Sequence, residues 1–207
     1  MKGLMEGAGP LVVLPDDEET AQKLFPLLPE CSLLAFPAPD WDRNLTPWAA
    51  PGLRKNEVFG GEAEAFLAEL LAAVREAEAA LDPKPASKLL MGYSLGGLFA
   101  LWAGTRTSEF ALLASVSGSL WYDGWCAYLE GNPCRAERVY LSLGEKEPRA
   151  KNPRMARVGE DTLRTEALLR ASGVGTTLEW NPGGHFNEPE ARMARAVRAL
   201  LGGVYVS

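Results

Sequence analysis

Short apolar runs alternate along this chain with longer stretches in which apolar and charged residues recur at helical spacing. The short runs are rich in leucine and valine, and several are closed by proline or glycine, as is typical of strands buried on both faces of a parallel sheet. We predict six strands, at residues 10–15, 31–37, 87–92, 110–118, 138–144 and 175–181.

The longer stretches predict helices. After Gly61, Phe66, Leu70 and Val74 recur on one face of a helix that Pro83 ends. Further helices are predicted at residues 95–104, 153–173 and 187–203. The segment 153–173 opens with proline and closes with glycine, and the segment 187–203 has acids first and arginines towards its end, which suits the helix dipole.

Strands that alternate with helices predict an α/β fold. We expect a mostly parallel sheet of about six strands with helices on both faces, in which residues 1–207 form a single domain. Residues 37–60 lack a regular pattern. Their prolines and aromatic residues predict an ordered loop over the surface.

The charge balance excludes several classes of partner. The net charge of −6 is not offset by any basic cluster, so neither nucleic acid nor an anionic membrane surface is expected to bind. No apolar run has signal-peptide length or approaches the roughly 18 residues of a membrane span. We therefore expect a cytoplasmic protein with a small-molecule partner. The sequence leaves its oligomeric state open.

The cysteines and the one histidine argue against a metal site. Cys31, Cys126 and Cys134 show no CxxC spacing, and His185 is the only histidine in the chain. Three reduced thiols are the simplest interpretation, with a Cys126–Cys134 bridge as the alternative.

A nucleophile motif stands where a predicted strand gives way to a predicted helix. Residues 92–96, Gly-Tyr-Ser-Leu-Gly, fit G-x-S-x-G in the strand–turn–helix context that this motif requires. Glycine at 92 and 96 is expected to let strand and helix approach, which presents Ser94 at the helix N-terminus. The alternative is a glycine-rich turn whose serine only caps the helix.

His185 is the natural base for that serine. A serine hydroxyl is a weak nucleophile until a base takes its proton, and histidine is the usual base. His185 follows the last predicted strand, as the order serine, acid, histidine requires. The alternative is a surface histidine in a loop.

The third member of a triad would be a carboxylate that orients the imidazole. The sequence after the strand 138–144 offers Glu145 and Glu147. We prefer Glu147, because its spacing places it beyond the strand end in a loop, and Glu145 remains the alternative. For each carboxylate, a solvated loop charge without a catalytic role is the other interpretation.

An oxyanion hole needs two backbone N–H groups. One is expected from Leu95, directly after the nucleophile, and the other from the loop after the first predicted strand. Pro15 has no N–H, so Asp16 is the expected second donor, with its neighbour in the loop as the alternative. The alternative is that this loop merely caps a helix that starts near Glu18.

Several segments together resemble the esterase D and enterochelin-esterase-like branch of the α/β-hydrolases, a family of serine esterases. They are RNLTP (43–47), GGEAEAFLAEL (60–70), GYSLGGLFALW (92–102), SGSLWYDG (117–124), VYLSLGEKE (139–147) and GGHF (183–186). The resemblance implies a serine carboxylic-ester hydrolase that acts through an acyl-enzyme on a small-molecule ester without cofactor or metal. It implies Ser94 as nucleophile and His185 as base.

The chain departs from that family in length, since only 93 residues precede Ser94, so the resemblance implies a trimmed α/β-hydrolase fold. The family's substrates include siderophore lactones, S-formylglutathione and feruloyl esters, and the sequence does not select among them. Trp121, Tyr122 and Phe186 are the expected pocket residues, with core packing as the alternative for each aromatic residue. A non-catalytic binding protein, or an acyltransferase or peptidase on the same scaffold, remains open.

Overall fold

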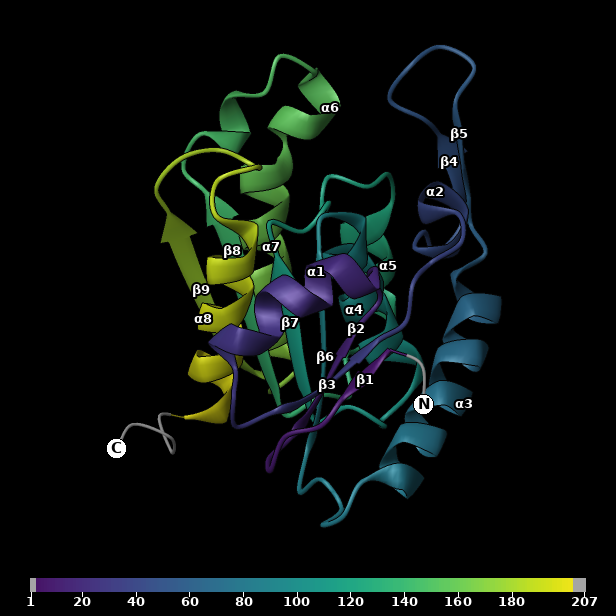
Figure 1. The fold of residues 1–207 in the computed structure, drawn as a ribbon. Coiled ribbons are helices and arrows are strands. Elements are labelled where there is room, and N and C mark those ends of the chain that lie inside the picture. The colour runs from purple at the N-terminus through teal and green to yellow at the C-terminus, as the bar shows by residue number, and fades with distance from the viewer. Residues whose placement is uncertain (1–2, 203–207) are drawn as a thin grey trace.

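The computed structural model describes residues 3–202, which form a central sheet covered by helices (Figure 1). The sheet has seven strands in the order β1-β3-β2-β6-β7-β8-β9. In chain order these are β1 (Leu4–Met5), β2 (Leu11–Leu14), β3 (Ser32–Ala35), β6 (Lys88–Tyr93), β7 (Leu112–Val116), β8 (Arg138–Gly144) and β9 (Gly175–Asn181). The pairs are parallel except for β1 with β3, which confirms the predicted mostly parallel sheet.

Helices cover both faces of the sheet. One face carries α3 (Ala63–Ala80), α4 (Leu95–Arg106), α5 (Trp125–Gly131) and α7 (Val158–Ala171), and the other carries α1 (Glu18–Leu24) and α8 (Pro189–Leu201). A 3₁₀ turn, η1 (Phe25–Leu27), extends α1. Within residues 3–202 no helix combines the length and the apolarity needed to cross a membrane.

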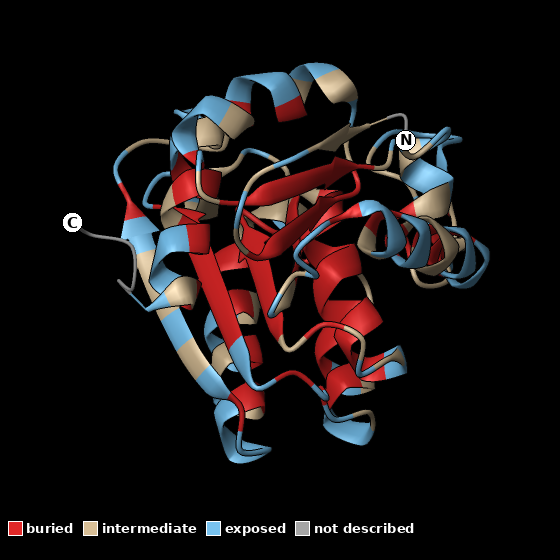
Figure 2. Cartoon of the chain, turned by 60° about the horizontal axis from the view of Figure 1, so that its bottom comes forward, coloured by how far each residue is buried: buried red, intermediate tan, exposed pale blue. Residues whose placement is uncertain are grey.

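The alternation of side chains along the strands builds a separate core on each face. In β2, Leu11 and Val13 pack beneath α3 and α4, whereas Val12 and Leu14 pack beneath α1 and α8. Figure 2 shows the central strands buried, while the outer helices keep exposed faces. The interior strands therefore read as continuous apolar runs because both of their faces are covered.

The predicted surface loop at residues 37–60 contains regular structure that the sequence did not suggest. It folds into a short helix, α2 (Trp41–Asn44), and a two-stranded hairpin of β4 (Ala49–Pro51) and β5 (Val58–Gly60). Elements of three or four residues are too short to show a periodic pattern. The two-residue strand β1 escaped prediction for the same reason.

The helix predicted at residues 153–173 is two helices, α6 (Pro153–Ala156) and α7. The break is at Arg157, whose N–H bonds to the carbonyl of Arg154, three residues back. The first turn of α7 then packs closely on the 3₁₀ turn η2 (Glu147–Arg149), where a Cβ on Gly159 would lie 2.9 Å from Pro148.

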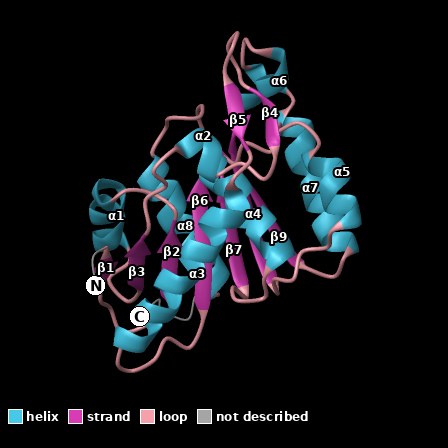
Figure 3. Ribbon diagram, turned by 90° about the vertical axis from the view of Figure 1, so that its right-hand side faces the viewer, coloured by secondary structure: helices cyan, strands magenta, loops and turns pink. Residues whose placement is uncertain are grey.

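The carboxyl ends of the parallel strands lie at one edge of the sheet, where ligands of such sheets usually bind. Ser94 follows β6, Ser117 follows β7, Glu147 lies just beyond β8 and His185 lies beyond β9. The β4–β5 hairpin and α6 rise above this edge (Figure 3). The candidate nucleophile, acid and base thus come from the ends of three strands at one edge of the sheet.

Candidate active site

Ser94 sits in a strained turn between β6 and α4. Its backbone has φ 56° and ψ −121°, which a residue with a side chain adopts only when its surroundings enforce it. The Ser94 N–H donates to the carbonyl of Val116 (3.1 Å), and the Ser94 carbonyl accepts from the N–H groups of Gly97 (3.0 Å) and Ser119 (2.9 Å). These bonds hold the turn from both sides.

The close approach of strand and helix at this turn depends on Gly92. A Cβ at this position would lie 2.1 Å from the carbonyl carbon and oxygen of Gly96, so no other residue fits. At Gly96 an added Cβ would make only ordinary contacts, with Pro15 at 3.7 Å and Trp41 at 3.9 Å. The expected steric role of glycine therefore holds at position 92 and is not required at position 96.

His185 and Glu147 are joined by a hydrogen bond. The imidazole Nδ1 lies 2.8 Å from Glu147 Oε2, and the side chains are 24% and 6% exposed. Glu145 is an exposed residue whose N–H bonds to the carbonyl of Asn181. Of the two carboxylates that the sequence offered, the structure brings Glu147 to the imidazole.

The second carboxylate oxygen of Glu147 is occupied by other donors. Oε1 accepts hydrogen bonds from Ser117 Oγ and from the Gly144 N–H, each at 2.7 Å. Burial would raise the pKa of this carboxyl. The bonds from His185, Ser117 and Gly144 outweigh burial, so the pKa lies below its ordinary value. Glu147 is therefore ionised at neutral pH.

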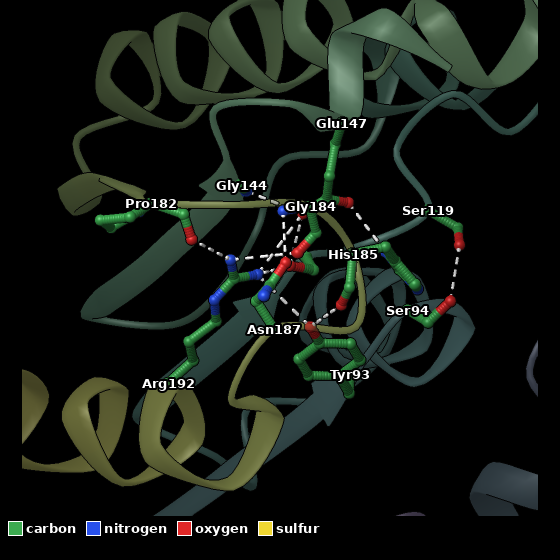
Figure 4. A network of polar contacts seen from close by, with 11 residues as sticks. Tyr93, Ser94, Ser119, Gly144, Glu147, Pro182, Gly184, His185, Asn187 and Arg192 are labelled. Atoms are coloured by element: carbon green, nitrogen blue, oxygen red, sulfur yellow. Dashed lines mark hydrogen bonds and ion pairs between the residues drawn. The ribbon is translucent and has the colours of Figure 1, made fainter. Parts of the chain in front are cut away.

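The loop that carries His185 is tied to β6 and to its own turn. The Tyr93 hydroxyl donates to the carbonyl of His185, and the Tyr93 ring lies edge-on to the imidazole at 5.3 Å between centroids. The Gly184 N–H donates to Asn187 Oδ1 at 2.7 Å. Figure 4 shows the imidazole between the Glu147 carboxylate and the Ser94 side chain.

The Ser94 hydroxyl has a neighbour that sequence reasoning missed. Its Oγ lies 3.3 Å from the Oγ of Ser119, and Ser119 is 3% exposed. A serine in a loop after β7 carries no sequence signal that distinguishes it from an ordinary turn residue.

The side chains of Ser94, Glu147 and His185 line a cavity of about 540 Å³. Its walls come from α2, the β4–β5 hairpin, the loop after β7, and α6 with the start of α7. Apolar side chains make up most of its lining: Trp41, Leu53, Phe59, Trp121, Met155, Val158 and Phe186. Asp42 and Lys146 are its other charged lining residues among those the structure describes. Such a site can accommodate the apolar part of a small molecule.

Two of the three predicted pocket residues line this cavity, Trp121 and Phe186. Tyr122 does not. It is 1% exposed in the core, where its hydroxyl donates to the carbonyl of Trp48. Its neighbour Trp121 points into the cavity instead, so for Tyr122 the core-packing alternative is correct.

The two predicted oxyanion donors lie in different surroundings. Leu95 is the first residue of α4 and lines the cavity, and an N–H in a first helical turn has no partner within the helix. Asp16 follows β2 at the same sheet edge but is not among the lining residues. Its carboxylate accepts from the Asp17 N–H at 2.8 Å and from Thr20 at 3.3 Å. The Asp16 donor stays a prediction.

Within the described residues, no three His, Cys, Asp or Glu side chains are grouped to hold a metal ion. The three cysteines are free and buried, so the structure has no Cys126–Cys134 bridge.

The sequence has a family match that covers most of the chain. The family model described as "Putative esterase" matches residues 30–191, and the chain belongs to this esterase family. No curated protein matches the sequence significantly.

Solved structures of esterases and related hydrolases share the fold. A siderophore hydrolase, EstA of Aspergillus nidulans, superposes with a TM-score of 0.73 at 20% identity over 94% of this chain and 82% of that one. An IroE-like serine hydrolase of Shewanella oneidensis gives 0.76 at 18% identity over 93% and 70%. The enterobactin esterase FES of Shigella flexneri gives 0.66 at 19% identity over 98% of this chain but 55% of that one. The fold is that of the α/β-hydrolases.

Proposed function

We propose that this protein is a serine carboxylic-ester hydrolase that acts on a small-molecule ester through an acyl-enzyme. The main support is the 2.8 Å hydrogen bond between His185 Nδ1 and the buried Glu147 side chain. It lies next to Ser94, which stands in a strained turn between strand and helix. An imidazole held by an ionised carboxylate beside a presented hydroxyl is the arrangement that activates a serine nucleophile.

In the proposed reaction, Ser94 Oγ attacks the ester carbonyl carbon while His185 Nε2 takes the hydroxyl proton. The carbonyl oxygen becomes an oxyanion, which the Leu95 N–H at the start of α4 would stabilise, with Asp16 N–H as the proposed second donor. When the intermediate collapses, the ester C–O bond breaks and His185 gives its proton to the leaving alcohol. Water then attacks the acyl-enzyme by the same route and releases the acid and Ser94.

Glu147 supports both halves of this cycle. Because its Oε2 accepts from Nδ1, the neutral imidazole carries its proton on Nδ1 and leaves Nε2 free to act as the base. When His185 becomes an imidazolium, the ionised carboxylate stabilises the positive charge. The depressed pKa of Glu147 supports this role.

Before substrate binds, the Ser94 hydroxyl has Ser119 Oγ as a partner at 3.3 Å. Proton transfer requires Ser94 Oγ to lie within hydrogen-bonding reach of Nε2. We expect that the Ser94 hydroxyl exchanges Ser119 for His185 Nε2 as its hydrogen-bond partner when substrate binds. Catalytic hydrogen bonds are often loose in the free enzyme.

The substrate class is argued from the cavity and the family. The cavity is mostly apolar and has room for a small acyl or alcohol group. The structures named above are a siderophore hydrolase, an IroE-like serine hydrolase and an enterobactin esterase. Their identity of 18–20% supports a shared fold and not a shared substrate. A small ester with an apolar part fits both sources of support.

The proposal is tested with Ser94→Ala on short p-nitrophenyl esters. Loss of the nucleophile is expected to lower kcat by on the order of 10⁶-fold. Thermal unfolding should show that the variant is folded, since Ala removes only the hydroxyl and its 3.3 Å contact with Ser119. Hydrolysis by a folded Ser94→Ala protein near the wild-type rate would refute the proposal, and an inactive wild type would favour a non-catalytic binding protein.

A further inference from the structure

Arg192 in α8 is a buried cation for which the proposed reaction has no role. Its side chain is 2% exposed, and arginine is almost never so buried without partners. It lies four residues into the helix, near the N-terminal end, where the helix dipole disfavours positive charge. Strong local contacts must therefore hold it there.

One set of contacts reaches the carboxylate of Glu147. Arg192 Nη1 donates to Ser117 Oγ at 2.9 Å and lies 3.6 Å from Glu147 Oε1. A guanidinium has no acceptor, so Ser117 must accept from it. The single hydroxyl proton of Ser117 is then directed to Glu147 Oε1, at 2.7 Å.

The other set of contacts reaches the loop that carries His185. Arg192 Nη2 donates to the carbonyls of Pro182 (3.1 Å) and Gly184 (3.2 Å). Gly184 directly precedes His185, so this contact fixes the backbone from which the imidazole projects. Figure 4 shows the guanidinium beside Pro182 and Gly184 of this loop.

A third contact links Arg192 to the residue before the nucleophile. Nη1 lies 3.4 Å from the Tyr93 hydroxyl, which donates to the His185 carbonyl. The titratable groups in contact with Arg192 are thus Tyr93 and Glu147. Tyr93 is neutral at physiological pH, because burial raises the pKa of its hydroxyl. Glu147 supplies the opposite charge.

We propose that Arg192 is the positioning residue that sets the His185–Glu147 pair, its planar fork joining the loop beyond β9 to the carboxylate beyond β8. The catalytic consequence rests on the proposed esterase function, whereas the geometric role does not. Without the guanidinium, the two loops lose the side chain that contacts both of them, and the Nδ1–Oε2 hydrogen bond is no longer held at 2.8 Å. Lysine is a poor substitute, because an ammonium is a point charge that cannot reach both sets of acceptors.

The test uses the single histidine of the chain. An Nδ1 proton held by a carboxylate gives a low-field proton NMR signal, and here that signal needs no assignment among several histidines. It is recorded for the wild type, Arg192→Met, Arg192→Lys and Arg195→Met, together with kcat and KM on a p-nitrophenyl ester. Arg195 is the matched control, because it lies on the same helix, is 43% exposed and pairs with Glu179 at 3.1 Å, away from the site.

The wild type and Arg195→Met are expected to show the signal and the same kcat. Arg192→Met should lose the signal and about 10²-fold in kcat, the cost of a misplaced catalytic group, with KM nearly unchanged. Arg192→Lys keeps the charge, so its NMR signal and its kcat should lie between those of the wild type and those of Arg192→Met. It replaces the methionine variant as the deciding protein if thermal unfolding shows that Arg192→Met does not fold.

A folded Arg192→Met or Arg192→Lys protein with the wild-type signal overturns the positioning role, whatever its kcat. Loss of the signal in Arg192→Met, with a wild type that hydrolyses no ester, supports the positioning role while the esterase proposal fails. The two claims can therefore fail separately.

Discussion

Glu147 and His185 lie 38 residues apart in the chain, and a 2.8 Å hydrogen bond joins Glu147 Oε2 to His185 Nδ1. The pair forms because β8 and β9 are parallel neighbours whose carboxyl ends lie at one edge of the sheet. Gly144, the last residue of β8, donates its N–H to the same carboxylate at 2.7 Å. The end of β8 thus orients the Glu147 carboxylate, and the loop after β9 places the His185 imidazole against it.

The choice between the two candidate acids predicts a difference between two matched variants. Glu147→Gln is expected to lower kcat/KM by about 10⁴-fold, because the amide cannot stabilise the imidazolium and favours the wrong tautomer. Glu145→Gln should change it less than twofold, since Glu145 is exposed. Steady-state assays of both proteins on one ester provide the comparison. Greater damage in Glu145→Gln would assign the acid to Glu145.

The depressed pKa of Glu147 predicts how stability depends on pH. Between the pKa in the folded protein and the ordinary value of 4.5, the unfolded chain binds more protons than the folded one. The contribution of Glu147 to the free energy of unfolding is therefore complete above about pH 5 and is lost as pH falls through the folded pKa. Urea unfolding at several pH values should show a shallower acid-side slope for Glu147→Gln than for wild type or Glu145→Gln. Equal slopes in all three proteins would contradict this linkage.

The sequence predicted the parts of the fold and site that have a local signature. The interior strands are continuous apolar runs, and Ser94 stands in a five-residue motif between a strand and a helix. His185 was found because the chain has no second histidine. Glu147 was preferred to Glu145 from spacing alone, and the structure places its carboxylate against the imidazole.

What the sequence missed depends on contacts between distant segments. Arg192 looked like one of several helix arginines, and its burial follows from loops that precede it by 8 to 75 residues. Leu53 and Met155 line the cavity only because the β4–β5 hairpin and α6 rise above the same sheet edge. Tyr122 was placed in the pocket by its aromatic ring, whereas its hydroxyl finds a backbone carbonyl in the core.

Phe186 predicts a preference for the alcohol part of the substrate. Its exposed fraction is 90%, it lines the cavity, and its ring lies 5.0 Å from the imidazole that would protonate the leaving alcohol. An apolar alcohol should cover this ring. Phe186→Ala is expected to lower kcat/KM about fivefold for aryl esters and little for methyl esters of the same acid, as the loss of about 1 kcal/mol of apolar contact implies.

The control for Phe186→Ala is Leu163→Ala, since Leu163 is a 49% exposed apolar residue on α7 outside the cavity lining. It should leave both classes of ester unaffected. An equal loss for methyl and aryl esters in Phe186→Ala would show that Phe186 supports the His185 loop rather than the substrate.

The buried cysteines predict slow thiol chemistry. Burial raises the pKa of Cys31 to about 11, and it also raises the pKa of Cys126 and Cys134. Because the thiolate is the reactive form, the native protein should react with a disulfide reagent at pH 8 only over hours, and three thiols should react at once in denaturant. Titration with Ellman's reagent measures both. One thiol in denaturant instead of three would reveal a disulfide that the structure lacks.

The most direct measurement of the central claim is labelling with a fluorophosphonate followed by peptide mass mapping. Such a probe phosphonylates a serine only where a base activates the hydroxyl, so the adduct reports nucleophile and base together. The account predicts one adduct, on Ser94, in the wild type, and none in folded Ser94→Ala or folded His185→Ala protein. A wild-type protein that stays unlabelled, or an adduct on another serine such as Ser119, would contradict it.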